Sequence, residues 1–386
     1  MKLIEAYALS CGLKISKPFI LDKFFPLDFD KYIVIHPFSK PSKSYDYWND
    51  VIDIIKPSLD ELKISIIQIG GQGEKNLKNC FNLQGKTNLN QCSYLLKNAL
   101  CLAGADSFSA HIAGSYDLKT VTLYSNSNPE NAGQYWGSKN NQITIVGDRR
   151  GEKASYALEE SPKTINSIPP EAIAKAICKH LDIDLNYPFE TVYVGKHYIG
   201  EFLTVFPCSS LIQHDPSFSP ELRMDLHFDE NILAQQLERN KCIIVSDRPI
   251  SLDILKKYKP QIAALIYLLK KDDNPSFVRD VKKLGLNLFC FTHLSEAELE
   301  NKKINYYDTI KINRIDQGDE ASLLKLKNSK GLYYSSRQHI FSNGQLFNSQ
   351  EAFLRNMPSS QRITPVIDSD RFWQQMEDFR ILKRVA

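Results

Sequence analysis

The sequence predicts an α/β protein built from two Rossmann-like parallel-sheet domains. Three observations support this fold class: short apolar runs alternate with amphipathic segments, the connections between them are short, and the alternation is interrupted once, near the middle of the chain. The chain of 386 residues is long enough for two such domains, because one domain typically takes roughly 100–200 residues.

The first half contains four predicted strands and four predicted helices. Apolar runs predict strands at 32–38, 64–71, 100–104 and 119–125, and amphipathic segments predict helices at 46–62, 89–99, 109–117 and 169–182. Each helix would return the chain to a strand parallel to the previous one. The alternation stops between residues 183 and 220, where the segment 190–207 alternates like a hairpin, so we expect a domain boundary there.

The second half resumes the same alternation. Strands are predicted at 242–247, 262–269, 286–293 and 309–314, and helices at 231–239, 252–258 and 275–285. Residues 368–384 are predicted as a last helix, with Asp368 or Ser369 as its cap. We therefore expect a first domain over 1–186, a second Rossmann-like domain over 187–345 and a helical tail over 346–386.

Composition is that of an ordinary folded protein. Hydrophobic residues make up 42% of the chain, which excludes a disordered protein. The formal charge of +3 is not the large basic excess that would indicate nucleic-acid binding. No run of about 18 apolar residues is present and the N-terminus is too interrupted for a secretion signal, so a cytoplasmic location is expected. The eight cysteines show no CxxC pair and no zinc spacing, and we interpret them as reduced, mostly buried thiols.

Polar residues follow the predicted strands of the first half at the ends where parallel sheets bind ligands. These residues are His36, Ser39, Lys40 and Lys43, then Gly70, Gly71, Gly73 and Glu74, then Asp106, Ser107 and Ser109, and finally Ser125, Asn126 and Asn128. A diphosphate ligand needs this set, because lysine offsets its charge, small residues open a helix beside it and a carboxylate can reach a ribose. Each residue alone is also compatible with an ordinary turn, but their joint placement favours a phosphate site.

The order of these segments resembles the nucleotide-sugar half of the heptosyltransferases, glycosyltransferase family nine, which has the two-Rossmann GT-B architecture. The resemblance covers roughly residues 5–182. The matching motifs are Ser39, Lys43 and Trp48, then Gly85, Lys86, Thr87 and Leu89, then Asp106, Ser107, Phe108 and His111, and last Leu123, Tyr124 and Pro129.

The resemblance implies a set of donor-binding residues, namely Ser39, Lys43, Gly71, Glu74, Asp106, Ser107, Ser109 and His111. In this set Lys43 and the Asp106–Ser107 turn would hold the diphosphate, Glu74 would reach the ribose and His111 would support the turn. Two departures are visible, since Ser107 replaces a threonine and Phe108 replaces a glycine of the family pattern. Phe108 leaves the backbone less room to approach the phosphates.

In that family the nucleotide-sugar half is the C-terminal one, and an acceptor domain with the catalytic carboxylate precedes it. Here "MKLIEAYALSCGL" resembles the interdomain helix that follows the acceptor domain. We therefore expect the halves in swapped order, as in a circular permutation, with the general base in the second domain.

The candidates for this base lie at predicted strand ends. Asp247 and His293 are the best placed, followed by Asp225, His227 and Asp229. Two structural alternatives stay open, because Asp247 would also suit a cap for a helix near 251, and His293 would also suit the mere end of a strand.

The resulting functional hypothesis is an inverting, metal-independent glycosyltransferase that uses a nucleotide-diphosphate sugar and no other cofactor. A saccharide is the expected acceptor, with a protein or a modified nucleic-acid base as alternatives. The competing hypothesis is a non-catalytic sugar-nucleotide-binding or interaction protein.

Overall fold

A computed structural model describes residues 1–199, 202–207, 219–306, 310–315, 319–359 and 361–385. The chain divides into two compact units, Met1–Thr191 and Val192–Arg384. The division falls inside strand β7 (Phe189–Val194), whereas the sequence placed the boundary between residues 186 and 187.

The first unit contains one parallel sheet with the strand order β3-β2-β1-β4-β5-β6. This is the order of a Rossmann fold, so the predicted fold class is confirmed for this unit. Its strands are β1 (Tyr32–His36), β2 (Ser65–Gln68), β3 (Phe81–Asn82), β4 (Leu102–Ala105), β5 (Thr120–Tyr124) and β6 (Gln142–Val146). The sequence did not predict β3 and β6, which are edge strands with partly exposed side chains and therefore lack a continuous apolar run.

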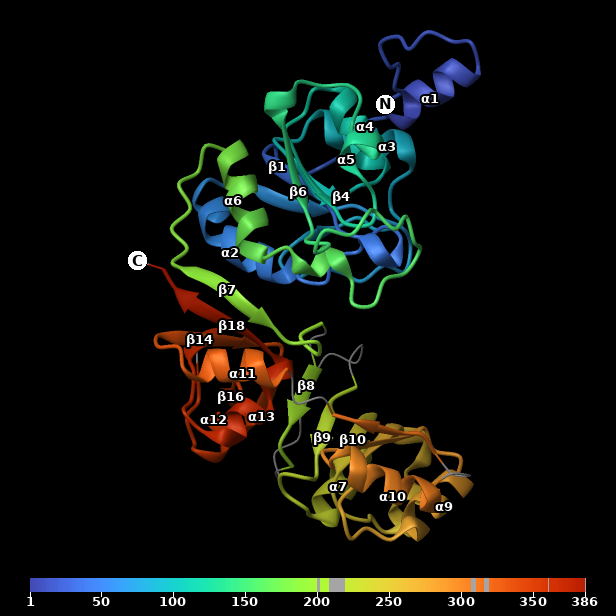
Figure 1. Cartoon of the computed structure of the whole chain (residues 1–386), viewed down its shortest axis with the longest axis vertical. Coiled ribbons are helices and arrows are strands. Elements are labelled where there is room, and N and C mark those ends of the chain that lie inside the picture. Colours follow the sequence, from blue (N-terminus) through green and yellow to red (C-terminus); the bar gives the residue numbers. More distant parts are fainter. Residues whose placement is uncertain (200–201, 208–218, 307–309, 316–318, 360, 386) are drawn as a thin grey trace. The chain divides into compact units, whose positions relative to one another are not determined.

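Helices flank this sheet, with α2 packed beside α6 and α3 beside α4 (Figure 1). They are α1 (Leu3–Ser10), α2 (Trp48–Glu61), α3 (Leu89–Lys97), α4 (Phe108–Ser115), α5 (Pro129–Ala132) and α6 (Pro170–His180), with 3-10 turns η1 (Pro41–Lys43), η2 (Lys139–Asn141) and η3 (Thr164–Ser167). Asn88 begins α3 with a capping box: its side chain accepts from the Gln91 backbone N–H at 2.9 Å, and the Gln91 side chain accepts from the Asn88 N–H at 3.0 Å.

The second unit contains an eight-stranded sheet with the order β13-β12-β11-β10-β9-β8-β15-β16. All its neighbouring strands are parallel except β15 and β16, which confirms the second predicted parallel sheet. Its strands are β8 (Phe202–Val205), β9 (Glu221–Arg223), β10 (Cys242–Ser246), β11 (Ile262–Leu268), β12 (Leu288–Thr292), β13 (Ile312–Arg314), β15 (Gln338–Ser342) and β16 (Gln345–Phe347).

A smaller sheet in this unit has the order β17-β14-β18-β7. Besides β7 it uses β14 (Leu332–Ser336), β17 (Ile363–Pro365) and β18 (Phe379–Arg384). The helices of the unit are α7 (Glu230–Leu237), α8 (Leu252–Lys257), α9 (Pro275–Lys283), α10 (Glu296–Tyr306), α11 (Glu320–Lys327), α12 (Gln350–Leu354) and α13 (Asp370–Gln374), with 3-10 turns η4 (Lys259–Gln261) and η5 (Met376–Asp378).

The hairpin expected over 190–207 is not formed. Strand β7 belongs to the small sheet and β8 to the large one, so the two are not paired. The alternating pattern correctly indicated two strands. It could not indicate their partners, which are residues 379–384 for β7 and residues 221–223 and 338–342 for β8.

The helical tail predicted over 346–386 is wrong. A short helix does begin after Ser369, whose hydroxyl accepts from the Phe372 backbone N–H at 3.1 Å, but it ends at Gln374. The following segment forms β18, which pairs antiparallel with β14 from Ser336↔Phe379 to Leu332↔Lys383. Burial of Phe379 and its apolar neighbours in this sheet outweighs the local helical preference.

The described cysteines form no disulfide bond, and Cys92, Cys101, Cys178, Cys242 and Cys290 are buried. Cys11 is exposed and Cys80 is half-buried, while Cys208 lies outside the described residues. Among the helices in the described ranges, none has the length and apolar character needed to cross a lipid bilayer.

Candidate functional site

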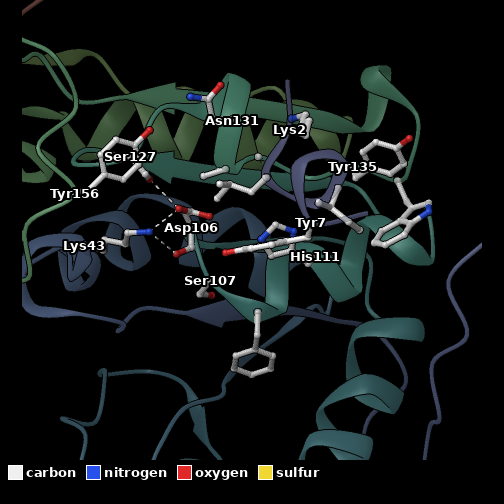
Figure 2. Close-up of a pocket in the computed structure, with 16 residues that line it drawn as sticks. Lys2, Tyr7, Lys43, Asp106, Ser107, His111, Ser127, Asn131, Tyr135 and Tyr156 are labelled. Atoms are coloured by element: carbon white, nitrogen blue, oxygen red, sulfur yellow. Dashed lines mark hydrogen bonds and ion pairs between the residues drawn. The ribbon is translucent and has the colours of Figure 1, made fainter. Parts of the chain in front are cut away.

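A pocket of about 460 Å³ opens in the first unit where strands β1, β4 and β5 end (Figure 2). Lys43 comes from the turn after β1, Asp106 and Ser107 follow β4, and Ser127 follows β5. Helix α4 begins at the same place, so the ends of three parallel strands and one helix N-terminus meet at this pocket.

Asp106 connects the polar groups of the pocket. Its Oδ2 lies 2.5 Å from Lys43 Nζ and accepts a hydrogen bond from Ser127 Oγ at 2.8 Å, as the dashed lines of Figure 2 mark. The Asp106 side chain is 6% exposed and that of Lys43 is 18% exposed. The ammonium of Lys43 is therefore fixed beside the pocket by a buried carboxylate.

Helix α4 begins at the pocket, which Ser107 and Phe108 line, and the first N–H groups of an α-helix generally lack partners within the helix. Ser107 occupies the N-cap position, but its side chain does not cap the helix. Its Oγ lies instead 2.9 Å from His36 Nδ1, and Ser109 Oγ lies 2.8 Å from the same nitrogen. Burial lowers the pKa of His36 to about 4, so a neutral imidazole holds both hydroxyls.

Aromatic side chains form part of the remaining pocket wall, which Lys2, Leu3, Ile4, Asn131, Ala132 and Gly133 complete. Tyr7 comes from α1, Tyr135 and Trp136 follow α5, and Tyr156 comes from the loop before η3. Figure 2 shows Tyr7 next to His111. This wall gives the pocket an apolar surface large enough for a planar or ring-shaped group.

Four of the eight predicted donor-binding residues line this pocket: Lys43, Asp106, Ser107 and His111. The pKa of His111 is lowered because the surrounding wall partly desolvates it, while Asp106 opposes this shift. Ser39 lies outside the pocket, where its backbone N–H donates to Ser44 Oγ at 3.1 Å.

The remaining predicted residues also lie outside the pocket lining, namely Gly71, Glu74 and Ser109. The Glu74 carboxylate lies over the glycine pair: a Cβ on Gly70 would come within 2.0 Å of Glu74 Oε2, and one on Gly71 within 3.1 Å of Oε1. In this structure the missing side chains of the two glycines make room for Glu74 itself.

Sequence reasoning missed Ser127 and the aromatic wall. Ser127 could have been found, because it stands among the residues after β5 that the sequence already associated with the pocket. Tyr7 and Tyr156 gave no such signal, since they come from segments outside the regular strand–helix alternation.

A second pocket, of about 870 Å³, lies in the second unit at the ends of β9 to β13. Both predicted base candidates line it, Asp247 after β10 and His293 after β12. Asp247 Oδ2 lies 2.5 Å from Lys270 Nζ, while α8 has Ser251 at its N-cap, so Asp247 does not cap that helix. Burial lowers the pKa of His293, and Asp378 opposes this shift.

The other base candidates differ in their surroundings. Asp225 lines the pocket and forms a two-point ion pair with Arg223, with distances of 2.7 and 2.6 Å. Asp229 caps α7 by accepting from the backbone N–H groups of Asn231 and Ile232, and His227 lies against the ring of Phe206. Neither Asp229 nor His227 lines the pocket.

No group of three His, Cys, Asp or Glu side chains within the described residues is arranged to hold a metal ion.

Comparison with known proteins connects the first pocket with one family. Residues 11–164 match the family described as glycosyltransferase family 9 (heptosyltransferase). No curated relative matches the chain.

Two solved structures match part of the chain. The Escherichia coli ADP-heptose LPS heptosyltransferase II is 18% identical over 46% of this chain and 50% of its own, with a TM-score of 0.31. A family 9 glycosyltransferase from Veillonella parvula is 20% identical over 46% of this chain and 50% of its own, with a TM-score of 0.32. The chain thus spans about half the length of the solved structures that it matches.

Proposed function

We propose that the chain, whose residues 11–164 match glycosyltransferase family 9, transfers a sugar from a nucleotide-diphosphate sugar to an acceptor hydroxyl. The observation that carries the proposal is the Lys43–Asp106–Ser127 cluster beside the N-terminus of α4. In this cluster Lys43 supplies the positive charge that a diphosphate leaving group needs as the bond to the sugar breaks, and Asp106, itself bonded to Ser127, holds Lys43 in place.

The donor would bind with its diphosphate between Lys43 and the first N–H groups of α4. Lys43 carries three N–H donors, so it can bond to a phosphate oxygen while Asp106 still holds it. The ring of the nucleobase or the sugar would lie on the wall formed by Tyr7, Tyr135 and Tyr156.

The proposed step is a single displacement. The acceptor oxygen forms a bond to the anomeric carbon, the bond from that carbon to the diphosphate oxygen breaks, and the nucleoside diphosphate leaves with the electron pair. Because the acceptor attacks on the face opposite the leaving group, the configuration of the anomeric carbon is inverted. The acceptor proton passes to a general base, and no redox change occurs. Lys43 and the α4 dipole supply the positive charge that the leaving group requires, and we propose that the step needs no metal ion.

For the general base we retain Asp247 and His293 as the candidates. His293 suits this role because its lowered pKa leaves a neutral imidazole that can accept a proton. The swapped order of the donor and acceptor halves and a cytoplasmic location are further parts of this proposal, and a saccharide is the proposed acceptor class.

The test is to incubate the full chain with ADP-, GDP- and UDP-sugars and to measure the release of nucleoside diphosphate. We expect slow hydrolysis of at least one donor, and a loss of about 100-fold in Lys43→Ala, which is typical when one group that stabilises developing charge is removed. Lys56→Ala is the matched control, because Lys56 pairs with Asp60 on α2 away from the pocket.

The competing function is a non-catalytic sugar-nucleotide-binding protein. Binding of a donor without turnover over a broad acceptor panel would favour it, and equal activity of the Lys43→Ala and Lys56→Ala variants would contradict the proposed donor site.

A further inference from the structure

The pocket of the second unit has an uneven distribution of charge. Its lining lysines are mostly exposed, with Lys270 at 55% and Lys271 at 70%. Its carboxylates are deeper: the side chains of Asp225, Asp247 and Asp378 are 7%, 17% and 29% exposed. These carboxylates lie deeper than the two lysines, and Arg223, which is 18% exposed and paired with Asp225, lies among them.

Two inner carboxylates lack a lysine or arginine partner. Asp225 is paired with Arg223, and Asp247 with Lys270. Glu221 accepts a hydrogen bond from Thr204 Oγ1 at 3.4 Å, and Asp378 Oδ1 lies 3.3 Å from His197 Nδ1. Within the described ranges, neither Glu221 nor Asp378 forms an ion pair with a lysine or arginine.

The surroundings of Glu221 favour an additional positive charge. Burial raises the pKa of Glu221, the nearby Arg223 opposes the rise, and the negative charges of Asp378 and Asp225 add to it. A ligand cation next to Glu221 would relieve this repulsion. Within the described residues no three-ligand metal set is present, so an organic ammonium group suits the position better than a metal ion.

The rest of the pocket suits a sugar ring. Phe291 and Phe379 give it apolar surface, and Gln338 and Gln374 add amide groups that can both donate to and accept from hydroxyls. A volume of about 870 Å³ falls in the range of ligand pockets, roughly 300–1,000 Å³.

We propose that this pocket binds a saccharide with a free amino group, whose ammonium lies between Glu221 and Asp378 and whose hydroxyls contact the glutamines. The site needs only residues of the second unit, so it stands independently of the donor pocket. If the proposed transfer is correct, an amino sugar is the acceptor, and this one assignment rests on the proposed function.

The test compares two ligands that differ in one charge per ring. The full chain is titrated by calorimetry with the β-1,4-linked glucosamine disaccharide and with its N,N′-diacetyl form, near neutral pH. We expect the free amine to bind at least about tenfold more tightly, which is roughly the worth of one charge-assisted hydrogen bond. Equal affinity for the two ligands, or binding of neither, would overturn the proposal.

Variants of the pocket carboxylates test whether the preference for the free amine over the acetylated ligand arises in this pocket. Glu221→Gln keeps the size and the contact with Thr204 but removes the charge, so the preference for the amine should disappear; Asp378→Asn should reduce it. Asp280→Asn is the control for removal of a carboxylate elsewhere in the unit, because Asp280 pairs with Lys283 and lies outside the pocket. An unchanged preference in both Glu221→Gln and Asp378→Asn would refute the assignment.

One further variant separates this proposal from the proposed function. Lys43→Ala should abolish donor turnover and leave the amine preference intact, because Lys43 belongs to the pocket of the first unit. Loss of donor turnover in all proteins together with a retained amine preference would contradict the transferase and support the amine site. Donor turnover that Lys43→Ala abolishes, together with no preference for the amine in any of the proteins, would support the transferase and contradict the amine site.

Discussion

The two pockets lie at the same place in their sheets but use charge differently. Each opens where parallel strands end, the position at which open α/β sheets bind ligands. In the first pocket one buried carboxylate, Asp106, holds a lysine and a serine. In the second, several carboxylates lie deep and the lysines are exposed. Shared topology thus fixes where a ligand binds, and the side chains at the strand ends decide which charge it carries.

The first way to test this comparison is to remove one aspartate from each pocket. Asp106→Ala should lower the free energy of unfolding by about 3 kcal/mol, because it leaves the largely buried Lys43 without its counter-charge. Asp247→Ala should cost less than about 1 kcal/mol, because Lys270 is 55% exposed and can turn into water. Urea unfolding curves of the two variants and the parent chain measure both values.

Equal losses in the two variants would mean that the first ion pair is no better shielded from water than the second. The m-value of each curve should stay unchanged, which shows that the same surface unfolds in all three proteins.

How much of this could be predicted from the sequence depends on how local each feature is. Lys43, Asp106 and Ser107 were predicted because each directly follows a strand whose apolar run is visible. Strand β18 was not predicted. Residues 379–384 form a strand because they pair with β14, which is distant in the sequence. Tertiary contact overrides local preference in such segments.

The carboxylates of the second pocket show the same limit. Asp247 and His293 stand at strand ends that the sequence reveals, and both line the pocket, while their role as general base stays a prediction. Glu221 opens β9, and Asp378 comes from a 3-10 turn that the sequence analysis placed in a helix. Only the folded chain brings these two side chains into one pocket.

A second, comparable effect should appear in the acid sensitivity of the first unit. His36 has a pKa of about 4 in the fold and an ordinary value of 6.5 when unfolded. Between these values the unfolded chain binds the additional proton, so stability is full above pH 6.5 and falls as the pH drops to about 4. The loss amounts to about 3 kcal/mol.

The check is urea unfolding of the parent chain and of His36→Gln across this pH range, followed by the fluorescence of the buried Trp48. The variant should lose the part of the acid dependence that His36 contributes, whereas the part from His111, His180 and His293, whose pKa values burial also lowers, should remain. His227→Gln in the second unit is the control and should keep the acid dependence of the parent chain. A parent chain with a flat profile between pH 6.5 and 4 would show that His36 is not buried as a neutral imidazole.

The smallest effect is expected for Glu74, and it bears on the clearest difference between the predicted donor site and the pocket that the structure contains. The sequence assigned Glu74 to the ribose, whereas its carboxylate lies over Gly70 and Gly71, outside the pocket lining. Glu74→Ala should therefore change the donor KM by no more than about twofold, because no contact with the donor is removed. A KM increase of tenfold or more, measured beside Lys43→Ala in the same assay, would mean that Glu74 leaves the glycine pair and turns to the ribose when the donor binds. In that case the Glu74 carboxylate would lie over Gly70 and Gly71 only while the donor is absent. Gly70→Ala, whose Cβ would displace the carboxylate from this position, should then lower the donor KM.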